Sequence, residues 1–135
     1  MQYWLMKSEP DVFSWDDLVE KKTAEWDGVR NHQAQLHMKS MRKGDQAFFY
    51  HSNIGLEAVG VMEIVEEATA DSTDDTGKWL AVHVSPIRKL PRPVTLKTIK
   101  SDPALSEMSI IRQSRLSVAP VSPEEFRHIL RLAGE

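Results

Sequence analysis

The chain has 135 residues, no cysteine, 27% charged residues and a formal net charge of −3. One domain typically has about 100–150 residues, so we expect a single domain over residues 1–135 with a core of its own. The absence of cysteine excludes disulfide scaffolds, thiolate zinc sites and cysteine nucleophiles. No apolar run approaches the roughly 18 residues of a membrane span. No signal-peptide pattern precedes the first strand-like segment, so we expect a soluble cytoplasmic protein.

The small net charge hides blocks of alternating sign. Residues 9–27 carry seven acids against two lysines, and residues 57–75 carry seven acids and no base. Residues 30–43 carry four bases and no acid, and residues 88–115 carry seven bases against two acids. Such blocks are either ordinary solvated surface or the two halves of an acidic and a basic face. The second arrangement is compatible with binding to nucleic acid.

The N-terminal half predicts short strands alternating with two helices. Ser14 followed by Asp17 resembles a capping box at a helix start. Gly60, in the middle of an apolar strand pattern, predicts a bend or a bulge. The expected elements are strands at 3–6, 46–52 and 56–66 and helices at 14–21 and 31–41.

The C-terminal half predicts more short strands and a closing helix. Ser122 and Pro123, with Glu125 after them, indicate a helix start, and an apolar stripe follows. The expected elements are strands at 79–84, 110–111 and 116–118 and helices at 95–99 and 122–133. Short, irregularly spaced strands with few long helices favour an α+β fold with a small mixed barrel or a curled sheet.

The sequence contains no recognisable metal or phosphate-binding motif, and we expect neither a metal nor a cofactor. His32 and His37 are five residues apart, which places them on different faces of a helix. Lys7, Ser8 and Glu9 lie together at the end of the first strand, where a lysine and a carboxylate are capable of acid–base or nucleophilic chemistry. The ordinary alternative is that Lys7 pairs with an acid and Ser8 satisfies a local backbone group.

Several segments are too particular to be explained by packing alone. Together they resemble the EVE domain, known from the thymocyte nuclear protein-like family, over essentially the whole chain. The matching segments are Trp4–Pro10, Trp26–Ala34, Gly44-Asp45 with Phe48–Ser52, Pro93–Leu96 with Ile99-Lys100, and Arg112 with Arg115–Val118 and Pro120-Val121. The resemblance implies a PUA-like fold: a compact β-barrel or strongly curved mixed sheet with flanking short helices. It also implies kinship with the YTH domain, which reads a methylated base in RNA.

The resemblance further implies a nucleic-acid-binding module that recognises a modified base, such as a modified cytosine. The partner is DNA or RNA with such a base, or a free modified nucleoside. The chain departs from the family pattern at Gln35 or Leu36, where asparagine is frequent, and near Phe126, where a second aromatic residue is often tryptophan. It also lacks the basic N-terminal tail that eukaryotic members tend to carry, so we expect a bacterial protein that is located in the cytoplasm. Our default expectation for the oligomeric state is a monomer.

A reader of an extruded base needs an aromatic surface for stacking, polar groups that read the base edge and basic groups for phosphates. Trp26 precedes a turn and is the expected aromatic wall, unless it only packs under a loop. Asn31 is the expected edge reader, because an amide both donates and accepts, and it is equally suited to cap a helix. The expected pocket residues are Trp26, Asn31, Ser8, Glu9, Val29, His51 and Ser52. The expected phosphate contacts are Arg30, Lys39, Arg42, Lys43, Arg112 and Arg115, with Arg30 alternatively paired with Asp27 or Glu9.

Two rival functions stay open from the sequence. One is a small amidohydrolase of the ASCH type that acts on acylated nucleosides through Lys7 and Glu9, although no clear threonine partner is present. The other is a non-catalytic interaction module that binds a small molecule or a protein. We expect that the chain is not an enzyme.

Overall fold

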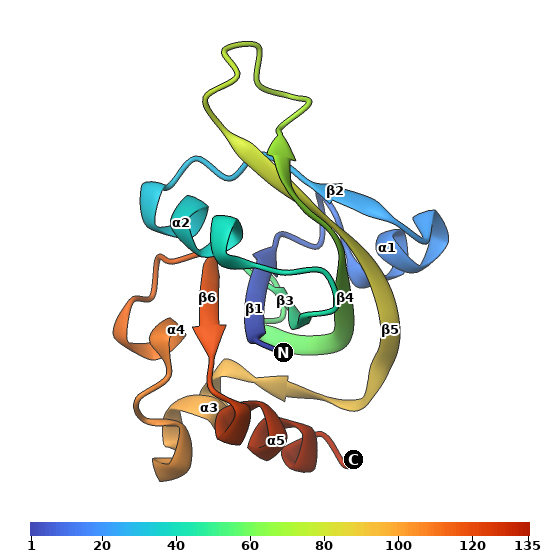
Figure 1. The fold of residues 1–135 in the computed structure, drawn as a ribbon. Helices are drawn as coiled ribbons and strands as arrows, with labels where there is room; N and C mark the ends of the chain where they lie inside the picture. The colour runs from blue at the N-terminus through green and yellow to red at the C-terminus, as the bar shows by residue number, and fades with distance from the viewer.

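In the computed structural model, which describes residues 1–135, six strands form one strongly curved mixed sheet. Their order is β2-β5-β4-β3-β1-β6 (Figure 1). The strands are β1 (Tyr3–Ser8), β2 (Ala24–Trp26), β3 (Gln46–His51), β4 (Glu57–Ala70), β5 (Leu80–Thr95) and β6 (Val118–Val121). The edge strands β2 and β6 do not pair with each other, so the sheet curves without closing into a barrel. The predicted α+β class with a strongly curved sheet is confirmed.

Short helices cover the sheet and its ends. They are α1 (Trp15–Lys21), α2 (His32–Ser40), α3 (Leu96–Ser101), the 3-10 turn η1 (Pro103–Leu105), α4 (Ser109–Arg112) and α5 (Pro123–Leu132). The two predicted capping boxes are present, with Ser14 and Asp17 at α1 and Ser122 and Glu125 at α5. None of the helices has the length and apolar character that crossing a membrane requires.

The parallel pairing of β1 with β3 determines where the site forms. Ser8 pairs with His51 at the ends of these two strands, so the loops that follow leave the sheet at the same edge. The Ser52 amide donates to the Ser8 carbonyl at 2.9 Å. The Asn53 side-chain amide donates to Glu9 Oε1 at 2.8 Å. The loops 9–14 and 52–56 therefore lie side by side.

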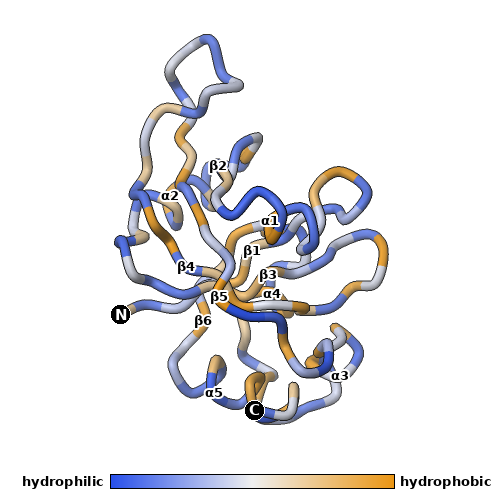
Figure 2. The backbone as a smooth tube through the Cα atoms, turned by 90° about the vertical axis from the view of Figure 1, so that its right-hand side faces the viewer, coloured by the Kyte–Doolittle hydropathy of each residue, from blue (hydrophilic) through white to orange (hydrophobic).

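One apolar core lies within the curve of the sheet. Hydrophobic segments are concentrated where the strands cross the centre of the molecule (Figure 2). Trp4 and Trp15 are 3% and 4% exposed, so both indoles pack in this core. The predicted irregularity at Gly60 is also present, as a shift in the β4–β5 register. A Cβ atom at Gly60 would lie 2.5 Å from the Trp15 ring, so only glycine lets the indole pack on the strand.

The sequence pattern was wrong about several elements. Residues 110–111 lie in helix α4 and not in a strand, because two apolar residues do not distinguish a strand from one buried helical turn. The strand predicted at 79–84 continues to Thr95, and Pro86 in it lies at a register shift of the ladder. The strand predicted at 116–118 runs instead from Val118 to Val121. It contains Pro120, which β6 tolerates because it is an edge strand. The three-residue strand β2 was not predicted.

Candidate nucleic-acid interface

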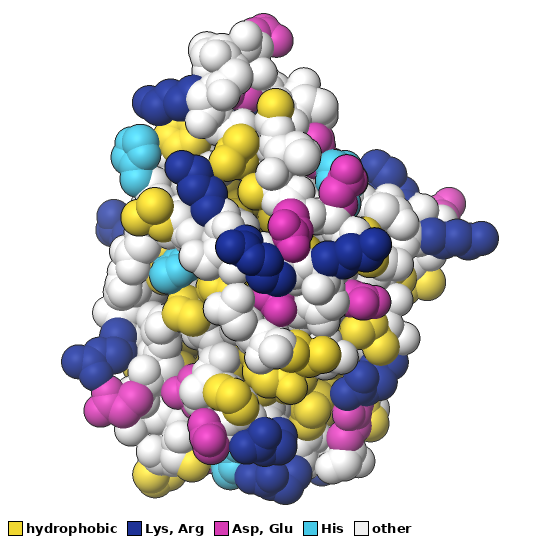
Figure 3. Space-filling model, in the orientation of Figure 1, with side chains coloured by type: hydrophobic (Ala, Val, Ile, Leu, Met, Phe, Trp, Pro, Cys, Tyr) yellow, Lys and Arg dark blue, Asp and Glu magenta, His cyan; other side chains and the backbone are white.

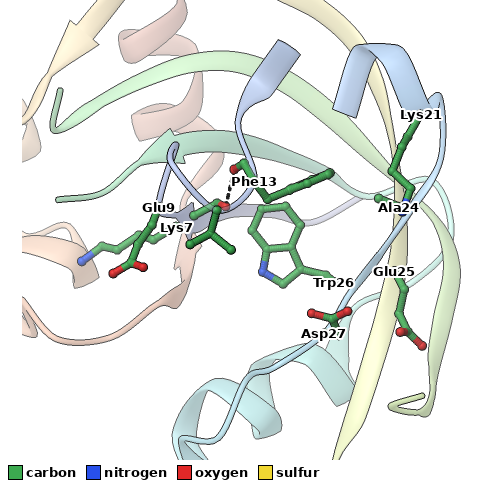
Figure 4. Close-up of a pocket in the computed structure, with 10 residues that line it drawn as sticks. Lys7, Glu9, Phe13, Lys21, Ala24, Glu25, Trp26 and Asp27 are labelled. Atoms are coloured by element: carbon green, nitrogen blue, oxygen red, sulfur yellow. Dashed lines mark hydrogen bonds between the residues drawn. The ribbon is translucent and has the colours of Figure 1, made fainter. Parts of the chain in front are cut away.

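A pocket of about 390 Å³ opens between the loop after β1 and strand β2. We call it the indole pocket. It is lined by Lys7, Ser8, Glu9, Val12, Phe13, Lys21, Ala24, Glu25, Trp26 and Asp27 (Figure 4). Its size lies in the range of about 300–1,000 Å³ that is usual for small-ligand sites. Three residues expected in a base pocket, Trp26, Ser8 and Glu9, therefore meet in one concavity.

The aromatic wall of the indole pocket is Trp26, the last residue of β2. Antiparallel pairing with Val82 of β5 fixes its backbone. Phe13 and Phe49 meet the indole edge to face, with ring centroids 6.5 and 5.4 Å away and interplanar angles of 84° and 82°. Trp26 is only 6% exposed. The indole is thus held in one orientation before any ligand arrives.

Carboxylates give the indole pocket an acidic edge. Figure 4 shows Glu9 on one side of the indole and Asp27 and Glu25 on the other. The Glu25 carboxylate accepts hydrogen bonds from the Ser72 amide, at 3.1 Å, and from the Ser72 hydroxyl. The Asp27 carboxylate has no hydrogen bond within the chain. Burial raises the pKa of this carboxyl, and the nearby charges of Asp71 and Glu25 raise it further. Asp27 is consequently an acceptor available to a ligand that presents N–H groups.

Lys7 and Ser8 both have structural partners at this pocket. The Lys7 ammonium donates to the Ser114 carbonyl at 3.0 Å and lies 5.9 Å from the centroid of the Tyr50 ring. Burial lowers the pKa of Lys7. The Ser8 hydroxyl donates to the Phe13 carbonyl at 2.6 Å, drawn dashed in Figure 4, and so holds the loop that carries Phe13.

Two further hollows continue from the indole pocket along the surface. The Tyr50 hollow, of about 460 Å³, shares Lys7 and Glu9 with the pocket and is otherwise lined by Tyr50, Ser52, Asn53, Leu56, Leu96, Ser114, Arg115 and Ser117. The Asn31 hollow, of about 320 Å³, shares Ser114 and Arg115 with it and adds Asn31, Gln33, Arg112, Gln113 and Leu116. The three form a connected surface, which we call the track. It contains the expected residues Ser52, Asn31, Arg112 and Arg115.

Asn31 caps α2 and remains at the track. Its side-chain oxygen accepts from the Ala34 amide at 2.9 Å, which leaves the amide nitrogen of Asn31 available. Arg112 is paired with Glu107, and both side chains are largely exposed. Arg115 lines two hollows and has no ion-pair partner within 4.0 Å.

The remaining expected pocket residues do not line the indole pocket. Val29 is buried in the core at 7% exposure. His51 Nε2 accepts from the Trp15 amide at 3.1 Å, at the first residue of α1. Only the neutral imidazole can accept this hydrogen bond at Nε2. Burial lowers the pKa of His51 and outweighs the charges of Glu57 and Asp16, which raise it. His51 thus supports a helix start.

Four expected phosphate contacts lie off the track. Arg30 pairs with Asp71 at 3.0 Å, and not with Asp27 or Glu9, and lies 5.5 Å from the Trp79 ring centroid. Lys39 lines a separate hollow with Trp79. The Arg42 guanidinium donates to the carbonyls of Lys39 and Met41, and Lys43 is exposed in the turn before β3.

Asp71 anchors the segment between Trp26 and α2. It is 2% exposed and accepts from the Gly28 amide at 2.9 Å, as well as from Arg30 and Thr73. Burial opposes its ionisation, but hydrogen bonds from Thr73, Gly28 and Arg30 outweigh this effect and hold the pKa of Asp71 below its usual range. The far wall of the indole pocket is therefore tied to the β4–β5 hairpin.

The residues that line the indole pocket without having been predicted from the sequence are Val12, Phe13, Lys21, Ala24, Glu25 and Asp27. Asp27 directly follows Trp26, but the sequence pattern suggested it only as an alternative partner of Arg30. Phe13 and Val12 lie in the loop after β1, and only the parallel pairing of β1 with β3 brings this loop to the site.

Comparison with known proteins gives close matches over nearly the whole chain. Mouse thymocyte nuclear protein 1 is 38% identical over 96% of this chain and 73% of its own length. A crystal structure from Agrobacterium tumefaciens superposes with a TM-score of 0.95 at 43% identity, covering 99% of this chain and 94% of that one. Human THYN1 protein in complex with 5-methylcytosine-containing DNA superposes with a TM-score of 0.93 at 35% identity, covering 100% and 99%.

The YTH domain of Zygosaccharomyces rouxii MRB1 protein, in complex with N6-methyladenosine RNA, shares the fold. Its TM-score is 0.63 at 17% identity, over 98% of this chain and 86% of that one. The model of the EVE domain matches residues 2–132. The extent of that match, and the identity with the mouse protein, establish that the chain belongs to the EVE domain family.

Proposed function

We propose that this chain binds nucleic acid and takes one modified base, a modified cytosine of DNA, into the indole pocket. The observation that carries the proposal is an aromatic-walled, acid-edged pocket that opens onto the track. The human relative in complex with 5-methylcytosine-containing DNA supports the same assignment.

Stacking on Trp26 supplies the main attraction for an extruded base. A base stacked on an aromatic side chain gains about 1–3 kcal/mol. Edge-to-face contacts with Phe13 and Phe49 hold the indole in place, so little side-chain entropy is lost when a base arrives. Extruding a base from a duplex costs the free energy of unstacking. Stacking on the fixed indole offsets part of that cost.

The acidic edge supports a preference for cytosine. Cytosine presents an exocyclic amino group, and carboxylates are the side chains that accept from it. Asp27 is free of internal partners, and Glu9 has an oxygen beyond the one that accepts from Asn53. Thymine and uracil carry a carbonyl at the same position, and a carboxylate repels it.

The track supports the path of the flanking strand. Lys7 and Arg115 lie along it, and Arg112 lies at its far end in the Asn31 hollow. Basic side chains spaced along a groove bind successive phosphates and release counterions. The chain therefore needs only a local basic surface, which is compatible with its net charge of −3.

The groups at the pocket favour binding over turnover. The Lys7 ammonium is hydrogen-bonded to the Ser114 carbonyl, and no threonine lines the indole pocket. The amidohydrolase alternative predicts hydrolysis of an acylated cytidine by the wild type and not by Lys7→Ala. Our proposal predicts no turnover by either.

Fluorescence anisotropy with single-stranded DNA tests the proposal. Matched oligonucleotides carry either one 5-methylcytosine or cytosine at the same position. Trp26→Ala is expected to weaken binding of the methylated strand about tenfold to hundredfold, because the stacking surface is lost. Trp79→Ala is the control, because Trp79 lines a separate hollow. Equal, weak binding of both strands by all three proteins would refute the proposal.

A further inference from the structure

Exposed apolar side chains are concentrated beside the indole pocket. Val12 is 74% exposed in the loop after β1, and Ile54 and Leu56 are 61% and 44% exposed in the loop after β3. Figure 2 shows hydrophobic loop tips that project away from the centre of the molecule. Val12 lines the indole pocket and Leu56 lines the Tyr50 hollow. Single exposed apolar residues are common, but three on two adjacent loops form a local feature that the core does not explain.

The loop that carries Ile54 has a fixed shape. Its Asn53 side chain is bound to Glu9 at 2.8 Å, the Ile54 amide donates to the Ser52 carbonyl at 2.8 Å, and the Leu96 amide donates to the Leu56 carbonyl at 2.8 Å. Asn53, Gly55 and Leu56 have φ angles of 68°, 90° and 47°. These contacts keep Ile54 at the tip, pointing to solvent, and tie the loop to the pocket wall through Glu9.

Basic surface flanks this tip on two sides. Lys7 and Arg115 line the Tyr50 hollow, which reaches Asn53 and Leu56. On the other side of Leu56 and Leu96 lies a shallow hollow that Lys97 and Lys100 line. An apolar tip between cationic groups is complementary to a duplex, whose base stack is apolar and whose two backbones are anionic.

We propose that the partner is double-stranded DNA and that Ile54 enters the base stack at the position that the extruded base vacates. This inference rests on the proposed function and names the form of nucleic acid that the site takes. Extrusion leaves a gap and an unpaired partner base, and an apolar side chain inserted between base steps fills such a gap. Val12, on the adjacent loop, contacts the flanking base pair, while Lys97 and Lys100 contact a phosphate backbone.

Binding of one methylated strand, alone and as a fully paired duplex, tests the wedge. Ile54→Ala is expected to weaken duplex binding about tenfold and single-strand binding less than about twofold, because only the duplex needs the gap filled. Ile87→Ala is the matched control, since Ile87 is also exposed, at 40%, and lines none of these hollows. In a second duplex, a 2-aminopurine that is paired with thymine next to the methylcytosine is expected to brighten with wild type, because insertion of Ile54 disturbs its stacking, and less with Ile54→Ala.

The outcomes separate the two proposals. Equal loss of affinity for duplex and single strand in Ile54→Ala, no loss for either, or failure of the wild type to bind the duplex would overturn the wedge. A wild type that binds methylated and unmethylated single strands equally would overturn the proposed function instead. Thermal melting of each variant verifies that it is folded, and Ile54 is exposed, so its truncation is expected to leave stability unchanged.

Discussion

Single residues in this protein have roles that follow from close packing. Glycine at position 60 lets the Trp15 indole lie against the β4 backbone, because a Cβ atom there would lie only 2.5 Å from the ring. Trp26, by contrast, makes edge-to-face contacts with Phe13 and Phe49 and lines a pocket. Two tryptophans with nearly equal exposure, 4% and 6%, therefore serve packing in one case and the wall of a site in the other.

Gly60→Ala is expected to lower the free energy of unfolding by about 3 kcal/mol, because the methyl group displaces a buried indole. Chemical denaturation measures the effect. Gly77→Ala is the control: its Cβ meets nothing within 4 Å, and only its φ of 74° disfavours alanine, which costs about 1 kcal/mol. Comparable losses in the two variants would show that the indole moves aside at little cost.

At the level of elements, side chains from one segment accept hydrogen bonds from the backbone of helix starts and loops elsewhere. His51, the last residue of β3, accepts the amide of Trp15 at the start of α1. Asp71 does the same for the segment after β2, through Gly28 and Arg30. These bonds connect segments that are 36–43 positions apart, and they orient both walls of the indole pocket.

The His51 bond predicts a loss of stability on acidification. Burial lowers the pKa of His51 in the folded chain, so the unfolded chain binds the proton more readily. The stabilisation is complete above the unfolded pKa of about 6.5 and falls as the pH drops below it. His51→Gln is expected to flatten the dependence of unfolding free energy between about pH 5 and pH 7.5.

Urea denaturation across that pH range provides the measurement. His32→Gln serves as the matched control, because His32 is an exposed histidine. A His51→Gln protein with the same pH dependence as the wild type would mean that the Trp15 contact does not depend on the neutral ring.

At the level of the whole molecule, the sequence predicted a mixed curved sheet and capped helices but not how the site assembles. Local patterns such as Ser14 with Asp17 carry their own geometry, so they were predictable. The adjacency of Glu9 and Asn53 depends on parallel pairing between β1 and β3, which no local pattern encodes. Arg30 was expected at a phosphate, or alternatively paired with Asp27 or Glu9, whereas the fold brings it to Asp71 of the β4–β5 hairpin.

The blocks of like charge in the sequence do not stay separate on the face of the folded chain that Figure 3 shows. Figure 3 shows lysine and arginine side chains interspersed with acidic ones over one face, not gathered into a single basic patch. On this side of the molecule, therefore, the charge blocks of the sequence do not form one acidic face and one basic face. The basic groups relevant to the proposed function are the few that line the track, chiefly Arg112 and Arg115.

Arg115→Gln is expected to weaken binding of methylated and unmethylated DNA strands by the same factor, because a contact to a phosphate does not depend on the identity of the base. It should also reduce the slope of log affinity against log salt by about 0.7 for a single strand. Salt titrations followed by anisotropy measure both. Arg127→Gln, an exposed arginine of α5, is the control. A change in the ratio between the two strands would assign Arg115 to base reading.

The central claim is that a methylated cytosine stacks on Trp26. Nuclear Overhauser contacts between the 5-methyl protons of a bound oligonucleotide and the protein test it most directly. The account predicts contacts from the methyl group to residues that line the indole pocket, together with an upfield ring-current shift of the methyl resonance. A methyl resonance at its free position, or contacts to Trp79 in its separate hollow, would contradict the account.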